Sequence, residues 1–489
     1  MAITRIPRVG TAYPESRLFF RGGLNNSVID ELIASHELSA VENYIPDLQN
    51  AGAIIKREGL TAASTVQTEA ATSIHQGKNA NYFTTSTNIN SFAGTSLATI
   101  TSSEEPDWVT FLDNDIMANG ADAPQTSTNG TTFGALGGAP PVFRYLAVHN
   151  NFLFGAGHSL GVLRWANLGT VGTWTATNGL TITNDQNDDI MGLAAWRGVL
   201  YVFCRRSFHH VNGFTTLEMG ITHSAYGVGC TSHRSIVPTP FALFWWTDSG
   251  IAMSKDGFNV TFPALLKIPN TLAGLNKDQY DRVHGVWDQQ ERCVKFFVHN
   301  SANQTTPNMA IYYYYEEDTF WPQTGTGAQM GASGTAVVSG DARVYVGSAA
   351  AASSYLYYQD DTVNTDDGTP IAAFLRTKRD APLGPTVVKR SKVFTAHVLM
   401  PGTVTLDYGV YLDNSDSLDT TWTLPLTGVG FVLGTDALGL GILGTGIKTS
   451  DVDIGFSRKY RKIKHQFSDN NIRRTRLVSV TNRGFVVNA

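Results

Sequence analysis

Short apolar strands, each centred on an aromatic residue, recur along most of the chain. Each strand is bounded by turns rich in Asn, Asp, Gly or Pro, which is the pattern of short strands joined by tight turns. The spacings between successive central residues are 43, 47, 43, 52 and 49, and one propeller blade takes about 40–50 residues. The central residues are Phe111, Phe154, Tyr201, Phe244, Phe296 and Tyr345. The repeat therefore has the period of propeller blades.

Six repeats predict a β-propeller of about six blades over residues 55–368. Stacking the blades around an axis would bury their apolar faces and protect their strand edges. Tyr82, 29 residues before Phe111, adds an extra half-repeat. An irregular array of β-sandwiches with chance aromatic spacing is the alternative. The expected fold class is all-β, with the propeller, a C-terminal β-sandwich or barrel-like domain and a short N-terminal helical or extended segment.

Helical periodicity is scarce, and residues 26–48 are its clearest case. Apolar residues recur there at roughly the spacing of helical turns, and Pro46 would end the helix. These apolar residues are Ile29, Leu32, Ile33, Leu38, Val41 and Ile45. We therefore predict an N-terminal arm over residues 1–54 that contains a short helix. The first ten residues lack the apolar segment of a secretory signal.

Charge is distributed unevenly along the chain. The segment from 370 to 489 holds 16 lysines and arginines against 9 aspartates and no glutamate, a net charge of +7. Because the whole chain carries −5, the first 369 residues carry −12. Strand-like runs continue through the basic segment. We therefore predict a separate basic β domain over residues 369–489, behind an acidic propeller.

A dense basic run is the strongest charge feature of that domain. Its lysines and arginines could neutralise nucleic-acid phosphates without reading sequence. They could equally form a solvated surface or salt bridges to the acidic part of a neighbouring subunit. The candidate residues for a DNA-channel or inter-subunit contact are Arg458, Lys459, Arg461, Lys462, Lys464, Arg473, Arg474 and Arg476. An acidic propeller interior would suit a conduit that must release DNA quickly.

An apolar stretch from 428 to 446 contains seven glycines. Its Gly439, Gly441 and Gly444 have the spacing of a dinucleotide-binding loop, but no helical pattern follows them, as that site would require. We expect a mobile loop at a subunit contact or a channel gate; an uninvolved surface insertion is the alternative. The glycines in question are Gly430, Gly434, Gly439, Gly441 and Gly444.

Signatures of catalysis and of metal binding are missing from the sequence. Three cysteines, Cys204, Cys230 and Cys293, form no paired motif, which excludes a disulfide scaffold and a cysteine zinc site and suits a reducing cytoplasm. The sequence has no nucleophile elbow, zincin motif, phosphate-binding loop or repeated Asp-box. We therefore expect no enzyme activity, no catalytic or metal-binding residues and no cofactor.

Several stretches resemble the bacteriophage tail nozzle family, also called tail tubular protein B or tail hub. Residues 138–174 resemble one blade of that family, with Pro140-Pro141 before an alternating strand and Trp174 at the end. Residues 184–213 and 229–254 resemble the next two blades. The Gly22-Gly23-Leu24-Asn25 turn resembles the opening of the family, and residues 374–394 resemble the start of its C-terminal domain.

The resemblance implies a structural virion protein of a short tail, assembled in the host cytoplasm. Such a protein forms a homo-oligomer, a six-fold ring, through a platform-like C-terminal domain. The ring continues the DNA channel, retains the packaged genome and opens for ejection. Its expected partners are the tail adaptor, tail fibre or needle proteins, and viral DNA in transient non-specific contact, with no membrane span. A carbohydrate-binding or glycan-degrading propeller tail protein is the alternative, and a propeller connector of a long-tailed phage is a third interpretation.

Overall fold

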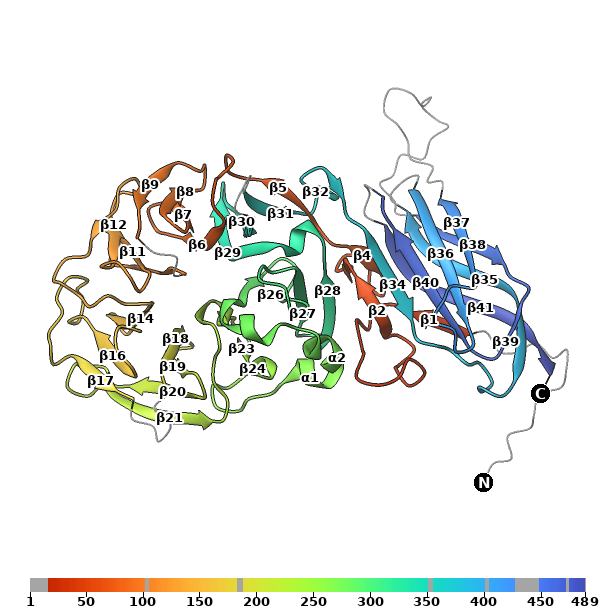
Figure 1. Cartoon of the computed structure of the whole chain (residues 1–489), viewed down its shortest axis with the longest axis horizontal. Helices are drawn as coiled ribbons and strands as arrows, with labels where there is room; N and C mark the ends of the chain where they lie inside the picture. The colour runs from red at the N-terminus through yellow and green to blue at the C-terminus, as the bar shows by residue number, and fades with distance from the viewer. Residues whose placement is uncertain are drawn as a thin grey trace.

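The computed structural model describes residues 16–101, 105–182, 188–350, 355–400, 404–426, 448–471 and 475–488. Strands dominate these residues. Seven small sheets are arranged in a ring, and two further sheets lie beside that ring (Figure 1). The helical elements are the short helices α1 (Pro263–Lys267) and α2 (Pro269–Ala273) and the 3-10 turns η1 (His233–Ser235), η2 (Lys277–Arg282) and η3 (Thr326–Ala328).

The first four sheets of the ring are four-stranded and antiparallel, and each follows the chain order. Blade 1 contains β6 (Ala71–Gln76), β7 (Asn81–Thr85), β8 (Asn88–Ser91) and β9 (Ser96–Thr99). Blade 2 contains β10 (Asp107–Phe111), β11 (Asn114–Ala118), β12 (Gln125–Ser127) and β13 (Gly134–Ala135). Blade 3 contains β14 (Tyr145–His149), β15 (Phe152–Ala156), β16 (Val162–Trp165) and β17 (Gly179–Thr181). Blade 4 contains β18 (Ile190–Trp196), β19 (Val199–Cys204), β20 (Ser207–Asn212) and β21 (Gly220–Tyr226).

Three more sheets complete the ring. Blade 5 contains β22 (Val237–Pro238), β23 (Leu243–Thr247) and β24 (Gly250–Ser254). Blade 6 contains β25 (His284–Asp288), β26 (Cys293–Val298), β27 (Met309–Tyr314) and β28 (Thr319–Gln323). Blade 7 contains β29 (Met330–Val338), β30 (Asp341–Ser348), β31 (Leu356–Asp360) and the N-terminal β5 (Gly59–Ala62), with β32 (Thr365–Asp366) and β33 (Thr369–Pro370) beyond it.

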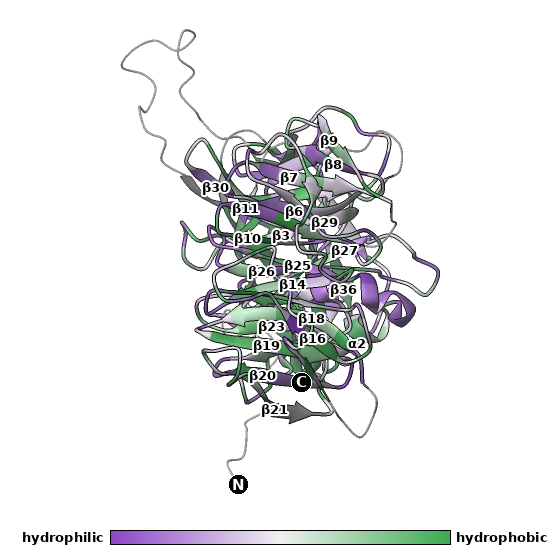
Figure 2. Ribbon diagram, turned by 90° about the vertical axis from the view of Figure 1, so that its left-hand side faces the viewer, coloured by the Kyte–Doolittle hydropathy of each residue, from purple (hydrophilic) through white to green (hydrophobic). Residues whose placement is uncertain are grey.

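The predicted all-β propeller is confirmed, but it has seven blades and not about six. From Phe154 onward the aromatic residues lie on the second strand of their blades and are buried; β19 and β23 are among the apolar strands of Figure 2. Tyr82 also lies on a second strand, so the half-repeat that it marked is a complete blade. Phe111 instead ends the first strand of blade 2, which explains the short interval before it.

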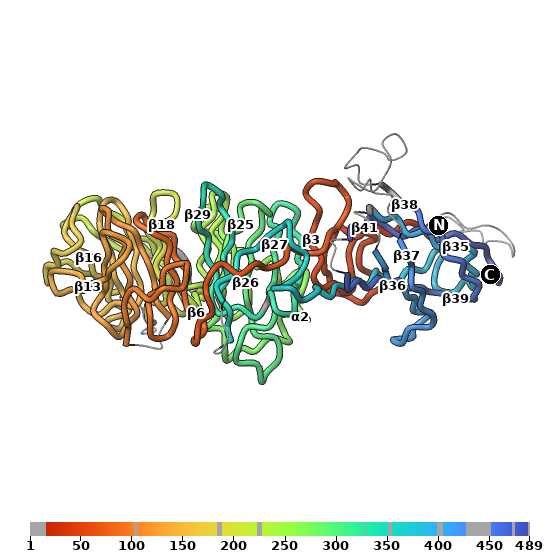
Figure 3. Tube along the Cα trace, turned by 90° about the horizontal axis from the view of Figure 1, so that it is seen from above, coloured from red at the N-terminus to blue at the C-terminus, as the bar shows by residue number. Residues whose placement is uncertain are grey.

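The ring closes by pairing distant parts of the chain. In blade 7, β5 pairs antiparallel with β31, with Leu60 opposite Gln359. This pairing joins the start of the propeller to its end, so that the last blade gains a strand and loses an exposed edge. Figure 3 shows the N-terminal segment running from the propeller into the second unit.

The second unit is a β-sandwich that contains both ends of the described chain. One sheet contains β1 (Ser16–Phe19), β3 (Tyr44–Pro46), β4 (Ile54–Lys56), β35 (Val388–Met400), β38 (Lys448–Gly455), β39 (Lys459–Tyr460) and β41 (Arg476–Asn488). The other contains β2 (Leu38–Glu42), β34 (Ala373–Thr377), β36 (Val404–Leu412), β37 (Thr420–Leu426) and β40 (Ile463–Asp469). Phe394 of β35 lies 5.1 Å from His465 of β40 between ring centroids, so the two sheets pack face to face.

The predicted N-terminal helix is wrong. Residues 26–37 form turns, and the residues after them form β2 and β3. Ile29 and Leu32 are 65% and 71% exposed, so they do not form the buried stripe that a helix would need. Leu38 and Val41 are buried because β2 pairs with β34, a strand more than 300 residues away. This pairing overrides the local periodicity.

Two consecutive charged residues fix the crossing between sandwich and propeller. Lys56 is fully buried and its Nζ lies 3.7 Å from a carboxylate oxygen of Asp469 in the sandwich. The next residue, Arg57, donates two hydrogen bonds of 2.8 and 2.5 Å to the carboxylate of Asp366 in β32. Each side of the crossing therefore has its own buried ion pair.

The third residue of this segment, Glu58, continues the network into blade 6. Lys295 Nζ lies 2.7 Å from Glu58 and 2.7 Å from Asp288, and 4.4 Å from the ring centre of Tyr312. Burial alone would lower the pKa of Lys295, but the two carboxylates outweigh it and raise that pKa well above its ordinary value. The N-terminal segment is thus tied to the propeller core by a fully buried charge.

Candidate functional site

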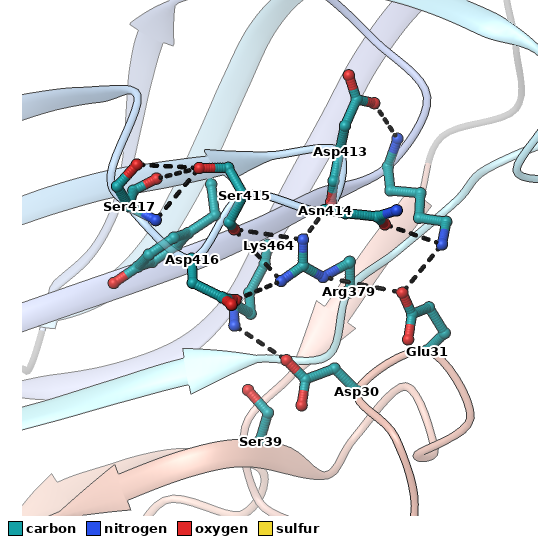
Figure 4. A network of polar contacts seen from close by, with 12 residues as sticks. Asp30, Glu31, Ser39, Arg379, Asp413, Asn414, Ser415, Asp416, Ser417 and Lys464 are labelled. Carbon is teal, nitrogen blue, oxygen red and sulfur yellow. Dashed lines mark hydrogen bonds and ion pairs between the residues drawn. The ribbon is translucent and has the colours of Figure 1, made fainter.

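The predicted basic run divides into residues that pair within the chain and residues that point outward. Lys462 Nζ lies 3.0 Å from Glu31, and Lys464 Nζ lies 2.9 Å from Asp30 (Figure 4). Lys464 also lies over the ring of Tyr411 at 4.9 Å. Both carboxylates belong to the turns before β2. These two lysines therefore attach the N-terminal segment to β40.

Arg379, outside the predicted run, belongs to the same network (Figure 4). Its guanidinium donates to the backbone oxygen of Asp413 and lies 3.3 Å from the carboxylate of Asp416. Its Nε lies 3.9 Å from Glu31. Burial raises and the hydrogen bond from Lys462 lowers the pKa of Glu31, and the net effect is a lowered pKa. The network is therefore an internal tie between the N-terminal turns and the sandwich.

Arg476 is also used internally. Its Nε lies 2.7 Å from the carboxylate of Asp47, and its side chain is largely buried. Two other members of the predicted set, Arg473 and Arg474, lie outside the described residues. The five glycines of the predicted gate also lie outside them, namely Gly430, Gly434, Gly439, Gly441 and Gly444.

The remaining predicted cations lie in β39 or directly beside it, and β39 lies at the end of the sandwich that points away from the propeller (Figure 1). Lys459 and Arg461 are exposed. The side chain of Arg458 is 62% exposed and lies 3.2 Å from Asp419. These three residues are the part of the predicted run that can meet an external partner.

The structure adds basic residues that the linear pattern did not reveal. Arg390 of β35 lies directly opposite Lys459 of β39 in the strand pairing. Lys392 on β35 and Arg483 on β41 are exposed near them, and Val393 pairs with Arg483. We call these cations the basic end. It consists of Arg390, Lys392, Arg458, Lys459, Arg461 and Arg483. In the sequence, the short basic stretch 389–392 indicates Arg390 and Lys392, whereas no neighbouring basic residue marks Arg483.

Arg390 and Lys459 form a like-charged pair across two strands of the basic end. Like charges directly opposite each other on neighbouring strands destabilise a sheet. Arg390 hydrogen-bonds to Ser457 Oγ, a neutral partner, so its charge is not cancelled by that bond. An external polyanion would reduce the repulsion between Arg390 and Lys459. The surface is therefore suited to phosphate groups or to an acidic protein surface.

The propeller axis is the second candidate site. The first strand of every blade lines a cavity of about 390 Å³ on the axis, so these strands are the innermost ones. His75, His233 and His284 are among its lining residues. His233 Nε2 lies 2.9 Å from Asp107, and His284 bonds to Met330 O at 2.8 Å. In the described ranges no group of three His, Cys, Asp or Glu side chains is placed to hold a metal ion.

Arg234 closes the axis. It is on η1 before blade 5 and donates to the backbone oxygens of Thr72 in blade 1 at 2.9 Å and Gly331 in blade 7 at 2.7 Å. Its second terminal nitrogen binds Glu105 and the backbone oxygen of Arg282. One side chain therefore links several blades across the centre. The described lining of the axis therefore contains this arginine and three histidines beside its carboxylates.

The cysteines have no part in either site. All three are buried and free. Burial raises the pKa of Cys204 to about 12 and that of Cys230 to about 12, so both stay protonated thiols at neutral pH. No helix within the described part of the chain is long and apolar enough to cross a membrane.

The comparison with known proteins found structural similarity to solved propeller domains. No family model and no curated protein matches the chain. The WD40 domain of Neurospora crassa Pan2 is 9% identical, with a TM-score of 0.40 over 64% of this chain and 98% of that one. BamB from Moraxella catarrhalis is 11% identical, with a TM-score of 0.35 over 72% and 99%. The AfRom2 CNH domain is 9% identical, with a TM-score of 0.40 over 62% and 99%. At these scores the likenesses carry no argument about activity or partners.

Proposed function

We propose that the chain is a structural virion protein, a subunit of a phage tail nozzle that surrounds the path of DNA. In this proposal the subunit acts through shape and charge and not through catalysis. It binds no cofactor. It assembles into a homo-oligomeric ring, six-fold in the nozzle family that it resembles, and meets the tail adaptor on one side and fibre or needle proteins on the other.

The observation that carries this proposal is the basic end of the sandwich. Six cations from three strands and the segments around them are gathered at one end of the sandwich, Arg458 among them with Asp419 3.2 Å away. Lys462, Lys464 and Arg476 instead form ion pairs with the N-terminal carboxylates of Glu31, Asp30 and Asp47. Lysine and arginine on such a surface bind phosphates without sequence preference and in a salt-dependent manner. This suits a protein that must touch passing DNA weakly.

The conduit would lie between subunits and not within one propeller. The axial cavity of about 390 Å³ is the size of a small-ligand pocket, and Arg234 crosses the axis. A duplex therefore cannot pass along this axis. A ring of copies that presents its basic ends or its acidic propellers inward would provide the channel.

The proposal is tested by the state of assembly of the full chain. Mass measurement on the purified protein, followed by electron microscopy, should give a closed ring with a central channel, many times heavier than the 53.0 kDa chain. A monomer at micromolar concentration that cleaves bacterial polysaccharide would contradict the nozzle proposal and favour the glycan-degrading alternative.

A further inference from the structure

A second cavity, of about 470 Å³, lies where the sandwich meets the propeller (Figure 1). This volume is within the range of small-molecule sites. One side is formed by β2, β34, β36 and β40 of the sandwich, and the other by the residues after β28 and by β32 and β33 of the propeller. Asp407 and Asn470 line it and are exposed, so solutes can reach it. We call it the junction cavity. Its lining includes Glu42, Thr324, Phe374, Arg376, Asp407 and Ser468.

Strand pairing places four of these residues in one row across the sheet. Phe374 of β34 pairs with Glu42 of β2 on one side and with Ser468 of β40 on the other. Ser468 pairs in turn with Asp407 of β36. Residues directly opposite each other point to the same face of a sheet. The backbones of Glu42 and Asp407 are therefore three strand spacings apart, about 14 Å, with Phe374 between them. Arg376, two residues along β34 from Phe374, points to the same face.

Arg376 is held in a fixed orientation by its neighbours. Its Nε donates a 2.7 Å hydrogen bond to Gln466 Oε1, which also accepts one from the hydroxyl of Tyr411. Its guanidinium lies over the rings of Phe374 and Tyr411, 5.5 and 5.4 Å from their centres. Its two terminal nitrogens have no hydrogen-bond or ion-pair partner among the described residues. A guanidinium oriented in this way is well suited to bind a carboxylate through two parallel hydrogen bonds.

Negative charge exceeds positive charge in the junction cavity. Two carboxylates of its lining are balanced by ion pairs, namely Asp366 by Arg57 and Asp469 by Lys56. The other two, those of Glu42 and Asp407, have no cation within ion-pair distance in the described part of the chain. Glu42 accepts a hydrogen bond from Thr324, and Asp407 accepts one from Thr423. Together with Arg376, one positive and two negative charges are thus available to a ligand.

We propose that the junction cavity binds an amino acid with a second amine, such as lysine or ornithine. Such a molecule carries one carboxylate and two ammonium groups, which complement Arg376, Glu42 and Asp407. Its α-carboxylate and α-ammonium group share one carbon, so they bind the two charges on neighbouring strands, Arg376 of β34 and Glu42 of β2. Its side-chain ammonium group then binds Asp407, and its methylene groups lie over Phe374.

This site lies within one chain and does not depend on the ring of copies. Its failure would therefore leave the nozzle proposal intact, and a failed ring would leave this site intact.

The test is calorimetric titration of the full chain with lysine, ornithine, cadaverine and norleucine. Cadaverine keeps both amines of lysine and lacks the carboxylate, whereas norleucine keeps the α-amino acid and lacks the side-chain amine. Lysine and ornithine should bind. Each of the other two should bind at least about tenfold more weakly than lysine, because each loses one charge-assisted contact. Absence of binding by both lysine and ornithine, or binding of cadaverine or norleucine as tightly as lysine, would overturn the proposal.

Two variants test the assigned partners separately. Arg376→Gln should weaken lysine binding at least about tenfold but should not weaken cadaverine binding, since cadaverine has no carboxylate. Asp407→Asn should weaken lysine binding but not norleucine binding, since norleucine has no side-chain amine. Asp407 is exposed, so this second variant keeps the test valid if Arg376→Gln disturbs the fold.

The matched control is Asp453→Asn. Asp453 is also an exposed aspartate of the sandwich that accepts a hydrogen bond from a threonine on the next strand, Thr395, but it does not line the junction cavity. This variant should bind lysine as the unchanged protein does, and thermal melting should show that it and Asp407→Asn are folded. Equal weakening of lysine binding by Asp453→Asn and Asp407→Asn would overturn the proposal.

Discussion

In the propeller, Lys295 is fully buried between Glu58 and Asp288, whereas at the far end of the sandwich Lys459 is exposed and lies opposite Arg390. The buried lysine lies between two carboxylates, and its ion pairs stabilise the fold only while they remain complete. Arg390 and Lys459 instead place like charges opposite each other, which does not stabilise the fold. The difference separates cations that hold the molecule together from cations available to a partner.

The largest effect on stability is expected at Lys295. Lys295→Met should lower the free energy of unfolding by about 3–5 kcal/mol, because it removes the positive charge that lies 2.7 Å from each of the buried Glu58 and Asp288 carboxylates. Chemical denaturation of the full chain measures this. Arg292→Ala, which removes an exposed partner of Glu316 in the same blade, should change stability by less than about 0.5 kcal/mol. Equal effects of the two variants would show that the buried lysine has no structural role.

Acid should weaken both units through buried neutral histidines. Burial lowers the pKa of His465 in the sandwich to about 3 and that of His284 in the propeller well below its ordinary value. The unfolded chain binds protons from about pH 6.5 downward, while the folded chain does not until the lower pKa is reached. Stability is therefore complete above pH 6.5 and is lost as the pH falls from there toward 3.

The expected loss is about 2 kcal/mol for His465 alone between pH 6.5 and pH 5. Denaturation at a series of pH values measures it. His465→Gln should flatten this dependence, and substitution of the exposed His36 by Gln should not. A pH dependence that is the same in all three proteins would contradict the assignment to His465.

A smaller effect is expected where the sandwich holds the N-terminal turns. Lys462→Ala/Lys464→Ala removes the contacts to Glu31 and Asp30 and should cost about 1 kcal/mol, since each partly exposed pair contributes a few tenths to about 1 kcal/mol. Hydrogen exchange of residues 26–37 should rise in this variant. Unchanged exchange in that segment would show that these lysines do not hold it.

The smallest effect on stability is expected at the basic end. Arg390→Ala/Lys459→Ala/Arg461→Ala removes exposed cations that repel one another, so the free energy of unfolding should stay within about 0.5 kcal/mol or rise slightly. Thermal and chemical denaturation check this. A large loss of stability would show that these three cations stabilise the fold, as Lys462 and Lys464 do, and would contradict the distinction between the two groups.

The sequence predicted the propeller because its signal is local. An aromatic residue in the second strand of a blade is buried by its own blade and by the next blade, which is adjacent in sequence, and Phe154 and Phe296 repeat at that position. The blade count was wrong because Phe111 is on a first strand, so that Tyr82 seemed to mark only half a repeat. The closing strand β5 could not be predicted, because its pairing with β31 joins residues almost 300 positions apart.

The candidate sites could not be predicted for the same reason, since each of them combines residues that are far apart in the sequence. Lys462 and Lys464 lie in the same basic run as Lys459 and Arg461, and only the folded chain brings Asp30 and Glu31 against the first two. Arg390 lies opposite Lys459, and Arg483 lies opposite Val393 on another neighbour of β35, in strands that are distant in sequence. Arg234 has no marker in the sequence, because its contacts to Thr72 and Gly331 exist only where the blades converge on the axis.

The most direct test of the distinction between internally paired cations and the cations of the basic end is the salt dependence of binding to duplex DNA of random sequence. On the assembled protein, the basic-end variant Arg390→Ala/Lys459→Ala/Arg461→Ala should lose affinity, and the slope of log affinity against log salt should decrease by about 2–3, close to 0.9 for each phosphate contact removed. Lys462→Ala/Lys464→Ala should keep the slope of the unchanged protein. An unchanged slope in the basic-end variant, or an equal decrease in both, would contradict the claim that the basic end is the surface that meets DNA.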